Sequence, residues 1–305
     1  MEKTAFLYPG QGSQTIGMGV SLVDEFPEAA AVFDCASEIA GYNILELCSQ
    51  GPIEKLSRTL YTQPALYTVE AALTDILRSR GVIPVCAAGH SLGEFSAWYS
   101  AESYSFEDGF KLISERGRIM DEADPKRRGT MQAVIGLDRD TVEEIIAGVD
   151  GTVVIANINA PGQLIISGDK NAVAEAGEKL KQAGAKRVLP LNVSGAFHSP
   201  LMGAAKDKFA YAVEDVMLSD ASIPVYTNVT GKPANDVDDI RLLMVAQLTS
   251  SVQWVDTIRN IAASGVKKAY EIGPGNVIAG LVRRIDPTIE VIGVSDADSI
   301  KEVTR

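Results

Sequence analysis

The chain has 305 residues, about twice the ~150 that serves as a prior for one domain, so one large domain or two fused domains fit. Hydrophobic residues make up 46% and charged residues 22%, a globular composition that excludes a disordered or fibrous chain. Lys and Arg number 28 against 40 Asp and Glu, and the resulting net charge of -12 repels polyphosphates and anionic lipid surfaces. We therefore expect no nucleic-acid partner and no membrane partner.

The cysteines, Cys35, Cys48 and Cys86, form no pattern typical of a disulfide framework or a zinc site, which favours a reducing compartment. The uncharged stretch over residues 4–23 is long enough to cross a bilayer, but Pro9 and several glycines interrupt it. It also lacks the continuous apolar core of about 7 to 15 residues that a secretory signal has. We expect a cytoplasmic protein without a bound metal.

The first part of the chain predicts alternating strands and helices. Short apolar runs are typical of buried strands, and apolar residues three or four apart are typical of helices. On these patterns we expect strands at 4–8 and 82–88 and helices at 64–80, 92–101 and 106–120. Thr62 is the candidate cap of the helix over 64–80, and Gly81 follows its end. The glycine-dense loop at 9–14 is a candidate wall of a site.

Residues 129–191 have a different pattern, which indicates an inserted unit with its own small sheet. We expect strands at 131–135, 153–158, 164–167 and 187–191 and helices at 142–146 and 173–180. Their order, βαββαβ, is that of a ferredoxin-like unit. After the insert we expect strands at 223–229, 268–272 and 289–294 and helices at 199–216, 240–248, 254–263 and 277–285. This alternation predicts an α/β unit with a parallel sheet.

Residues 89–93 read Gly-His-Ser-Leu-Gly, which matches the nucleophile elbow G-x-S-x-G. The glycines allow a sharp strand-to-helix turn that holds the hydroxyl of Ser91 clear of the backbone. The next amide, that of Leu92, lies near a helix N-terminus, where it can stabilise a developing oxyanion. A plain glycine-rich turn is the alternative, but the predicted strand before the motif and the helix after it favour a nucleophile.

A serine nucleophile needs a base, and the chain has two histidines. His90 adjoins Ser91 in the elbow, where the two side chains should diverge. His198 precedes the helix start predicted at Ser199 and Pro200, and it is therefore the candidate general base. The alternative for His198 is a loop histidine without a catalytic role.

Arg116 lies on the apolar side of the helix predicted over 106–120. When the segment is wound at about 100° per residue, the large apolar residues fall on one arc and Arg116 lies near its middle. A buried guanidinium needs an anion, and its planar fork suits a carboxylate. That carboxylate belongs either to a substrate or to a buried Asp or Glu, and the sequence leaves both open.

Together these motifs resemble the malonyl-CoA:acyl-carrier-protein transacylases, the acyltransferase family of fatty acid and polyketide synthesis. The resemblance runs nearly end to end and is carried by residues 11–14, 17–19, 89–94, 115–118, 157–162, 195–199 and 273–275, together with Gln247. It implies an α/β fold in two parts. These are an α/β-hydrolase-like catalytic subdomain with a parallel sheet, residues 1–127 and 196–305, and an inserted ferredoxin-like small subdomain, residues 128–195.

The resemblance also implies roles for residues of the catalytic centre. Ser91 would be the nucleophile and His198 the general base. The backbone carbonyl of Gln247 would orient His198 in place of a triad aspartate. Backbone amides of Gln11 and Leu92 would form the oxyanion hole.

In the same family pattern Arg116 holds the malonyl carboxylate, and Gln63 and Asn159 are pocket residues. Leu92 after the serine and Phe197 before the histidine resemble the malonyl-selective members. The implied reaction is ping-pong: a malonyl group passes from malonyl-CoA to the serine and then to the pantetheine thiol of an acyl carrier protein. Malonyl-CoA and the carrier are the implied partners, and no cofactor is implied.

Three alternatives stay open from the sequence. A serine esterase or thioesterase would share the elbow and the base but pass the acyl group to water. An acyltransferase for a different extender unit would share the whole machinery. A catalytically silent acyl-CoA-binding or carrier-binding protein would keep the fold alone.

Overall fold

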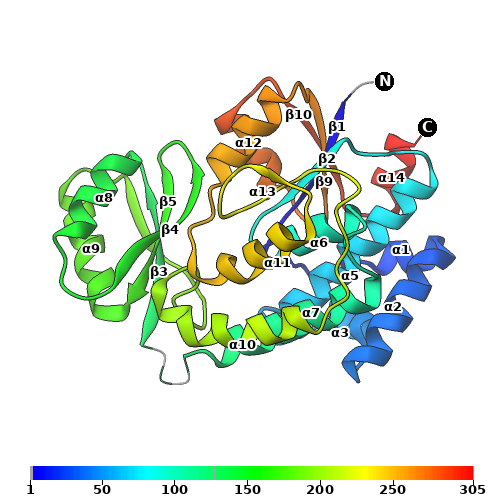
Figure 1. Ribbon diagram of the computed structural model, residues 1–305, viewed down its shortest axis with the longest axis horizontal. Helices are drawn as coiled ribbons and strands as arrows, with labels where there is room; N and C mark the ends of the chain where they lie inside the picture. Colours follow the sequence, from blue (N-terminus) through cyan, green and yellow to red (C-terminus); the bar gives the residue numbers. More distant parts are fainter. Residues whose placement is uncertain (1–2, 125, 127, 305) are drawn as a thin grey trace.

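The computed structural model describes residues 3–124, 126 and 128–304, which form two separate sheets (Figure 1). The larger sheet has the strand order β10-β9-β1-β2-β7-β8. Its strands are β1 (Thr4–Tyr8), β2 (Cys86–Gly89), β7 (Val225–Tyr226), β8 (Pro233–Ala234), β9 (Lys268–Ile272) and β10 (Glu290–Val294). All neighbours pair in parallel except β7 and β8, which confirms the predicted parallel sheet.

The central strand β1 is buried on both faces, because helices cover the large sheet from both sides. Phe6 and Tyr8 point into one core, with α1 (Val20–Glu25), α2 (Pro27–Ala40), α5 (Thr59–Ser79), α6 (Gly93–Ser100) and α7 (Phe106–Glu122). Ala5 and Leu7 point into the other, with α12 (Trp254–Ala263) and α13 (Val277–Ile285). The alternation follows from the period of two along a strand.

The remaining helical segments of the large part are short or peripheral. They are α3 (Ile44–Gln50), α4 (Ile53–Leu56), η1 (Pro200–Met202), α10 (Gly203–Glu214), α11 (Val237–Ala246), η2 (Gln247–Thr249) and α14 (Ala297–Val303). Within the described part of the chain, no helix combines the length and apolar character needed to cross a bilayer.

The smaller sheet contains β3 (Gly129–Ile135), β4 (Val153–Ala160), β5 (Gln163–Asp169) and β6 (Arg187–Pro190) in the order β4-β5-β3-β6. All of its pairs are antiparallel. The helices α8 (Arg139–Ala147) and α9 (Lys170–Gln182) pack on the sheet through a core of their own, at the left of Figure 1. This arrangement confirms the predicted ferredoxin-like unit. The predicted boundaries of the subdomains stay predictions, and residues 1, 127 and 305 lie outside the described residues.

Several expected elements have different bounds in the structure. The strand expected over 82–88 begins only at Cys86, since Pro84 has no N–H for a ladder. The helix expected over 64–80 starts at Thr59 and continues through Pro64. Thr62 is therefore not its cap, and its hydroxyl donates to the carbonyl of Leu56 at 2.5 Å. Because most of α5 is buried, packing outweighs the hydrogen bond lost at the proline.

Other differences lie in the second half of the chain and at its start. The strand expected over 223–229 is reduced to the two residues of β7, and the helix expected over 199–216 is divided into η1 and α10. The helices α1 to α4 and α14 and the strand β8 were not among the expected elements.

The two sheets are joined by contacts of β4 with the large part. The N–H of Val252 donates to the carbonyl of Ala156 at 2.8 Å, and the N–H of Ile158 donates to the carbonyl of Val252 at 2.9 Å. Arg284 of α13 donates to the carbonyl of Pro161 at 3.0 Å, beyond the end of β4. These bonds fix the distance between the subdomains and therefore the width of any site between them.

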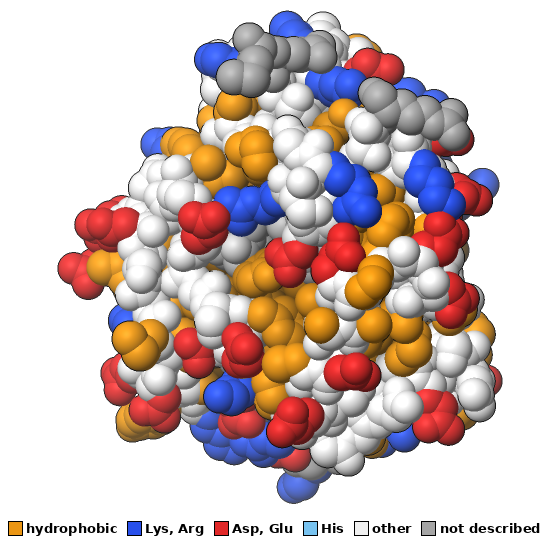
Figure 2. Space-filling model, turned by 90° about the vertical axis from the view of Figure 1, so that its right-hand side faces the viewer, with side chains coloured by type: hydrophobic (Ala, Val, Ile, Leu, Met, Phe, Trp, Pro, Cys, Tyr) orange, Lys and Arg blue, Asp and Glu red, His pale blue; other side chains and the backbone are white. Residues whose placement is uncertain are grey.

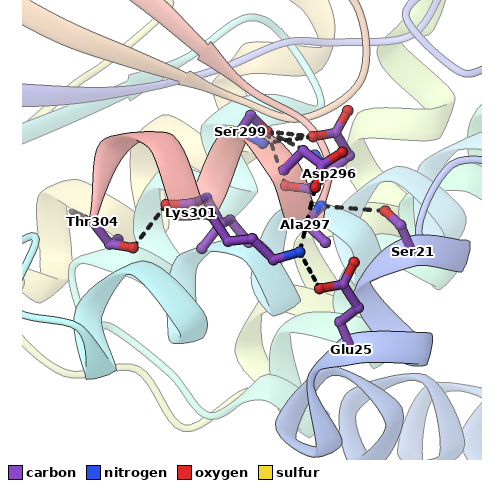
Figure 3. Close-up of polar contacts among 9 residues, drawn as sticks. Ser21, Glu25, Asp296, Ala297, Ser299, Lys301 and Thr304 are labelled. Atoms are coloured by element: carbon purple, nitrogen blue, oxygen red, sulfur yellow. Dashed lines mark hydrogen bonds and ion pairs between the residues drawn. The ribbon is translucent and has the colours of Figure 1, made fainter.

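The helix α14 packs against the N-terminal helix α1 (Figure 3). The N–H of Ala297 donates to the hydroxyl of Ser21 at 3.2 Å, and Lys301 forms an ion pair with Glu25. Figure 2 shows this side of the molecule, where acidic and basic side chains are scattered around apolar ones. Exposed pairs of this kind each contribute about 0 to 1 kcal/mol, so apolar contacts hold these helices in place.

The first turn of α14 is held by a capping box (Figure 3). The Asp296 carboxylate accepts the N–H of Ser299 at 2.9 Å, and the Ser299 hydroxyl accepts the N–H of Asp296 at 3.1 Å. We expect Asp296→Ala to lower the free energy of unfolding by about 1 kcal/mol in urea denaturation, since it leaves helix N–H groups without partners. Asp298→Ala is the control, because the Asp298 side chain is 89% exposed. Equal losses in both variants would contradict a capping role.

Candidate active site

Ser91 lies in a sharp turn between β2 and α6 with φ of 52°, a left-handed backbone that is costly for a residue other than glycine. The flanking glycines are required by space. A Cβ on Gly89 would lie 1.9 Å from the carbonyl carbon of Gly93, and one on Gly93 would lie 2.4 Å from the carbonyl oxygen of Tyr8. The turn therefore has the geometry of the predicted elbow.

His198 meets Ser91 from a loop 107 positions later in the chain. Its Nε2 lies 2.8 Å from the Ser91 Oγ, and its Nδ1 lies 2.9 Å from the backbone carbonyl oxygen of Gln247. A carbonyl can only accept, so the imidazole proton is assigned to Nδ1. The Nε2 lone pair is then free to accept the proton of the Ser91 hydroxyl.

Gln247, at the start of η2, connects this pair with the buried cation. Besides its carbonyl contact with His198, its side-chain Nε2 donates to the carbonyl of Ser91 at 3.0 Å. Its Oε1 accepts from the Nη2 of Arg116 at 2.8 Å. One residue thus restrains the nucleophile, the imidazole and the guanidinium together.

Arg116, on α7, is fully buried, as the helical winding predicts. Its Nη1 donates to the Oε1 of Gln63 at 2.8 Å, and its Nη2 lies 3.2 Å from the Ser91 Oγ. The guanidinium carbon also lies 5.1 Å from the ring centroid of Phe95. Among the described residues its hydrogen bonds go to amide and hydroxyl oxygens, so the alternative of a structural ion pair with a buried Asp or Glu is not observed.

A cavity of about 260 Å³ opens beside the Ser91 hydroxyl. Its lining includes eight of the nine residues singled out from the sequence: Gln11, Gln63, Ser91, Leu92, Arg116, Asn159, Phe197 and His198. The ninth, Gln247, lies behind Arg116 and is fully buried. Met131 of β3 and Ile165 of β5 also line the cavity, so the site lies between the two subdomains.

Comparisons with known proteins identify the family of this chain. A family model described as "Acyl transferase domain" matches residues 5–300. The chain belongs to this family. It is 40% identical over 304 residues to the malonyl CoA-acyl carrier protein transacylase of Bacillus subtilis (strain 168), covering 99% of this chain and 96% of that protein. It is 41% identical over 303 residues to the protein of the same name from Escherichia coli (strain K12), covering 98% of each.

Solved structures give the same result at the level of the fold. A malonyl-transacylase in complex with its type II PKS acyl-carrier protein superposes with a TM-score of 0.96 at 39% identity, covering 99% of both chains. The α/β fold with a parallel sheet and a separate antiparallel sheet is therefore that of the acyl transferase family.

The electrostatics of the acyl transferase site follow from burial. Burial lowers the pKa of Arg116 to about 9, which leaves the guanidinium charged at neutral pH. Burial, followed by the nearby charge of Arg116, lowers the pKa of His198 to about 3, against the effect of its bond to the Gln247 carbonyl. The imidazole is therefore neutral at neutral pH, the form that can accept a proton.

His90 points away from Ser91, as expected for neighbours in an elbow. Its Nε2 lies 2.8 Å from the Oδ1 of Asn159, and its ring packs edge-on against Trp254 at 5.4 Å between centroids. With Oδ1 bonded to His90, the amide Nδ2 of Asn159, a residue of the cavity lining, keeps its N–H donors for another partner. His90 thus orients a pocket residue of the small subdomain, a role that sequence reasoning missed.

Sequence reasoning also missed Asn228, whose Oδ1 accepts the N–H of Ser91 at 2.7 Å. The expected strand over 223–229 placed this residue inside a sheet, whereas β7 ends at Tyr226. The one available signal was topological, since the carboxyl ends of neighbouring parallel strands meet at one edge where sites form. No group of three or more His, Cys, Asp or Glu side chains within 3–124, 126 and 128–304 is placed to hold a metal ion.

The charge of Arg116 gives a test of the electrostatics. Arg116→Gln removes a cation that disfavours the imidazolium, so the pKa of His198 should rise. Because the reaction needs neutral imidazole, the acid limb of the rate of Ser91 modification should move to higher pH. We would measure the rate with an uncharged sulfonyl fluoride from pH 8 down to about pH 3, where His198 titrates. Arg118→Gln, on the exposed side of α7, should leave the limb unchanged; an unmoved limb in Arg116→Gln would contradict the coupling.

Proposed function

We propose that this chain transfers a malonyl group from malonyl-CoA to the pantetheine thiol of an acyl carrier protein, through a malonyl ester on Ser91. The observation that carries the proposal is the buried guanidinium of Arg116, which lies 3.2 Å from the Ser91 hydroxyl oxygen. A cation at that place suits an acyl group that ends in a carboxylate. The names of the relatives support both the donor and the acceptor.

In the first half-reaction the Ser91 Oγ attacks the thioester carbonyl of malonyl-CoA while His198 Nε2 takes the hydroxyl proton. The N–H groups of Leu92 and Gln11 stabilise the oxyanion. Leu92 is the N-cap of α6, where an N–H has no acceptor within the helix. The C–S bond then breaks, and His198 returns the proton to the sulfur. CoA leaves, and the malonyl group stays bound to Ser91 as an ester.

The second half-reaction is the reverse with a different thiol. The pantetheine thiol of the carrier gives its proton to His198 and attacks the ester carbonyl. The bond from carbonyl carbon to Ser91 Oγ breaks, and the proton passes back to Ser91. No redox step or bound group is needed for either substitution, and we propose that the enzyme uses no cofactor.

The hydrogen bond from His198 to a carbonyl instead of a carboxylate suits this chemistry. A carboxylate would favour the imidazolium, whereas the Gln247 carbonyl holds the ring in one tautomer without a full negative charge. Thiols ionise near pH 8.5, so a thiolate leaves with little help from an acid. We propose that Gln247 acts mainly by orienting the imidazole.

The alternatives differ in acceptor and acyl group. A serine esterase or thioesterase is not favoured, because its substrates need no buried cation beside the nucleophile, and the family relatives are transacylases. Phe197 is buried in the wall of the cavity and leaves less room for a branched extender unit. We propose malonyl as the acyl group, with Gln63 and Asn159 as pocket residues. The three free thiols among the described residues support a cytoplasmic location.

The nucleophile can be tested by mass. We expect wild-type protein mixed with malonyl-CoA to gain one malonyl group, and the modified peptide to contain residue 91. Ser91→Ala should form no adduct, because no other hydroxyl in the described part of the chain is paired with His198 in this way. Intact-mass measurement within seconds of mixing checks this. An undiminished adduct on Ser91→Ala would remove Ser91 from the mechanism.

The selectivity of Arg116 can be tested by comparing donors. The guanidinium should bind the malonyl carboxylate with a charge-assisted pair worth about 2 kcal/mol, roughly 30-fold in preference over acetyl-CoA. We expect Arg116→Ala to lose most of this preference in single-turnover acylation. Arg118→Ala is the matched control, since that side chain pairs with Glu115 and Glu122 on the other side of α7. An unchanged malonyl-to-acetyl ratio in Arg116→Ala would show that the carboxylate binds elsewhere.

A further inference from the structure

Asn228 is fully buried beside the elbow, although it lies 137 positions from Ser91 in the chain. The strand β7 pairs in parallel with β2, with Tyr226 opposite Ala88. Both strands therefore end at the same edge of the sheet. The chain reaches Asn228 just where β2 passes into the turn that carries Ser91.

The carboxamide of Asn228 binds two backbone groups of the elbow at once. Its Oδ1 accepts the N–H of Ser91 at 2.7 Å, and its Nδ2 donates to the carbonyl of Gly89 at 2.7 Å. A donor and an acceptor on the same carbon are needed for both bonds. Because the φ of Ser91 is 52°, its backbone needs such a restraint to stay in the left-handed region.

The backbone of Asn228 is itself held in place. Its N–H donates to the Glu94 carboxylate, and its carbonyl accepts the N–H of Gln253 at 2.8 Å. The N–H of Glu94 in turn donates to the carbonyl of Ser91 at 3.2 Å. Ser91, Asn228 and Glu94 therefore form a closed ring of three hydrogen bonds behind the nucleophile. All members of this ring except Ser91 are fully buried.

We propose that Asn228 is a positioning residue for the acyl transfer, which fixes the strained backbone of Ser91 so that its hydroxyl lies between His198 and Arg116. Asn228 is not in the lining of the cavity formed by the described residues, so it acts through Ser91 and not on the substrate. The inference rests on the proposed function for its acyl donor, but the placement of the hydroxyl is independent of that donor. Loss of Asn228 should therefore slow acylation and leave substrate binding unchanged.

The first experiment compares Asn228→Ala with Thr227→Val. Thr227 is the adjacent residue, is equally buried, and uses its hydroxyl on Thr230 at 2.8 Å, away from the elbow. We would measure single-turnover acylation by malonyl-CoA, the dissociation constant of malonyl-CoA on a Ser91→Ala background, and the rate of Ser91 modification by an uncharged sulfonyl fluoride. For a hydroxyl displaced by about 1 Å, acylation falls about 100-fold. The rate of Ser91 modification by the sulfonyl fluoride should fall by a similar factor. The dissociation constant of malonyl-CoA should change by less than about twofold.

The second experiment uses Asn228→Asp, which has the shape of the native side chain. When protonated, an Asp carboxyl has one O–H donor for Gly89 and one carbonyl acceptor for Ser91, which is the pattern of the amide. When ionised, it loses the donor. The groups that face this position are the Glu94 carboxyl, whose pKa burial raises to about 7, and, through Gln247, the Arg116 guanidinium. His198 stays neutral above about pH 4.

We expect Asn228→Asp to modify Ser91 at nearly the wild-type rate when its carboxyl is protonated, near pH 5, and to slow as the pH rises through the pKa of that carboxyl. A carboxyl buried beside another one has a pKa above the usual value, which places this descending limb above about pH 4. Because Glu94 titrates near pH 7 in both proteins, the limb due to Asn228→Asp is the part of the pH profile that the wild type does not share. Melting temperatures measured at each pH confirm that both proteins are folded in the range used.

The outcomes separate the inference from the proposed function. The positioning role is supported if Ser91 is modified slowly in Asn228→Ala and at the wild-type rate in Thr227→Val, and if Asn228→Asp shows the new limb. This holds even if malonyl-CoA is not the donor. The positioning role is overturned if Asn228→Ala modifies Ser91 at a rate within threefold of wild type. It is also overturned if Thr227→Val loses as much rate as Asn228→Ala, or if Asn228→Ala weakens only the binding of malonyl-CoA. If Asn228→Ala does not fold, the limb in Asn228→Asp decides: its absence overturns the inference.

Discussion

The buried guanidinium of Arg116 is held by the amide oxygens of Gln63 and Gln247, and the rest of the site depends on this arrangement. Amide oxygens satisfy N–H donors without neutralising a charge. Against the larger effect of burial, the buried Glu94 carboxyl raises the pKa of Arg116 from a distance, but it forms no ion pair with Arg116 among the described residues. The field of the cation acts on the Ser91 hydroxyl 3.2 Å away and on the imidazole of His198. A carboxylate bonded to the guanidinium would have weakened that field, and with it the selection of a charged acyl group that we propose for Arg116.

The same field bears on how His198, the proposed general base, would act without a triad carboxylate. His198 is kept neutral by burial and by the nearby cation, and the Gln247 carbonyl assigns its tautomer. A neutral imidazole can accept the Ser91 proton. In the proposed reaction, neither the departure of the CoA thiol nor the attack by the pantetheine thiol requires a strong acid. Gln247 contacts the base, the nucleophile and the cation, so changes at this one residue disturb all three.

The position of the site between two sheets has a physical cause. The large sheet supplies the strained turn with Ser91, and the small sheet supplies the wall that carries Asn159, which His90 orients across the gap. Backbone bonds between β4 and Val252 hold the two walls at a fixed separation. Neither subdomain alone contains the cavity, which suits the proposed reaction, in which a large thioester donor and a large thiol acceptor enter in turn.

Local patterns in the sequence were sufficient for the elbow at Ser91, for the burial of Arg116 and for the order of helices and strands along the small subdomain. Each of these elements depends on residues close together in the chain, where the apolar period reports which face is buried. Only the tertiary structure decided that Asn228 and Gln247 restrain the Ser91 backbone, that α5 continues through Pro64, and that amides satisfy the cation. Side-chain bonds to backbone groups more than 100 positions away leave no period in the sequence, because they are set by how strands and helices pack.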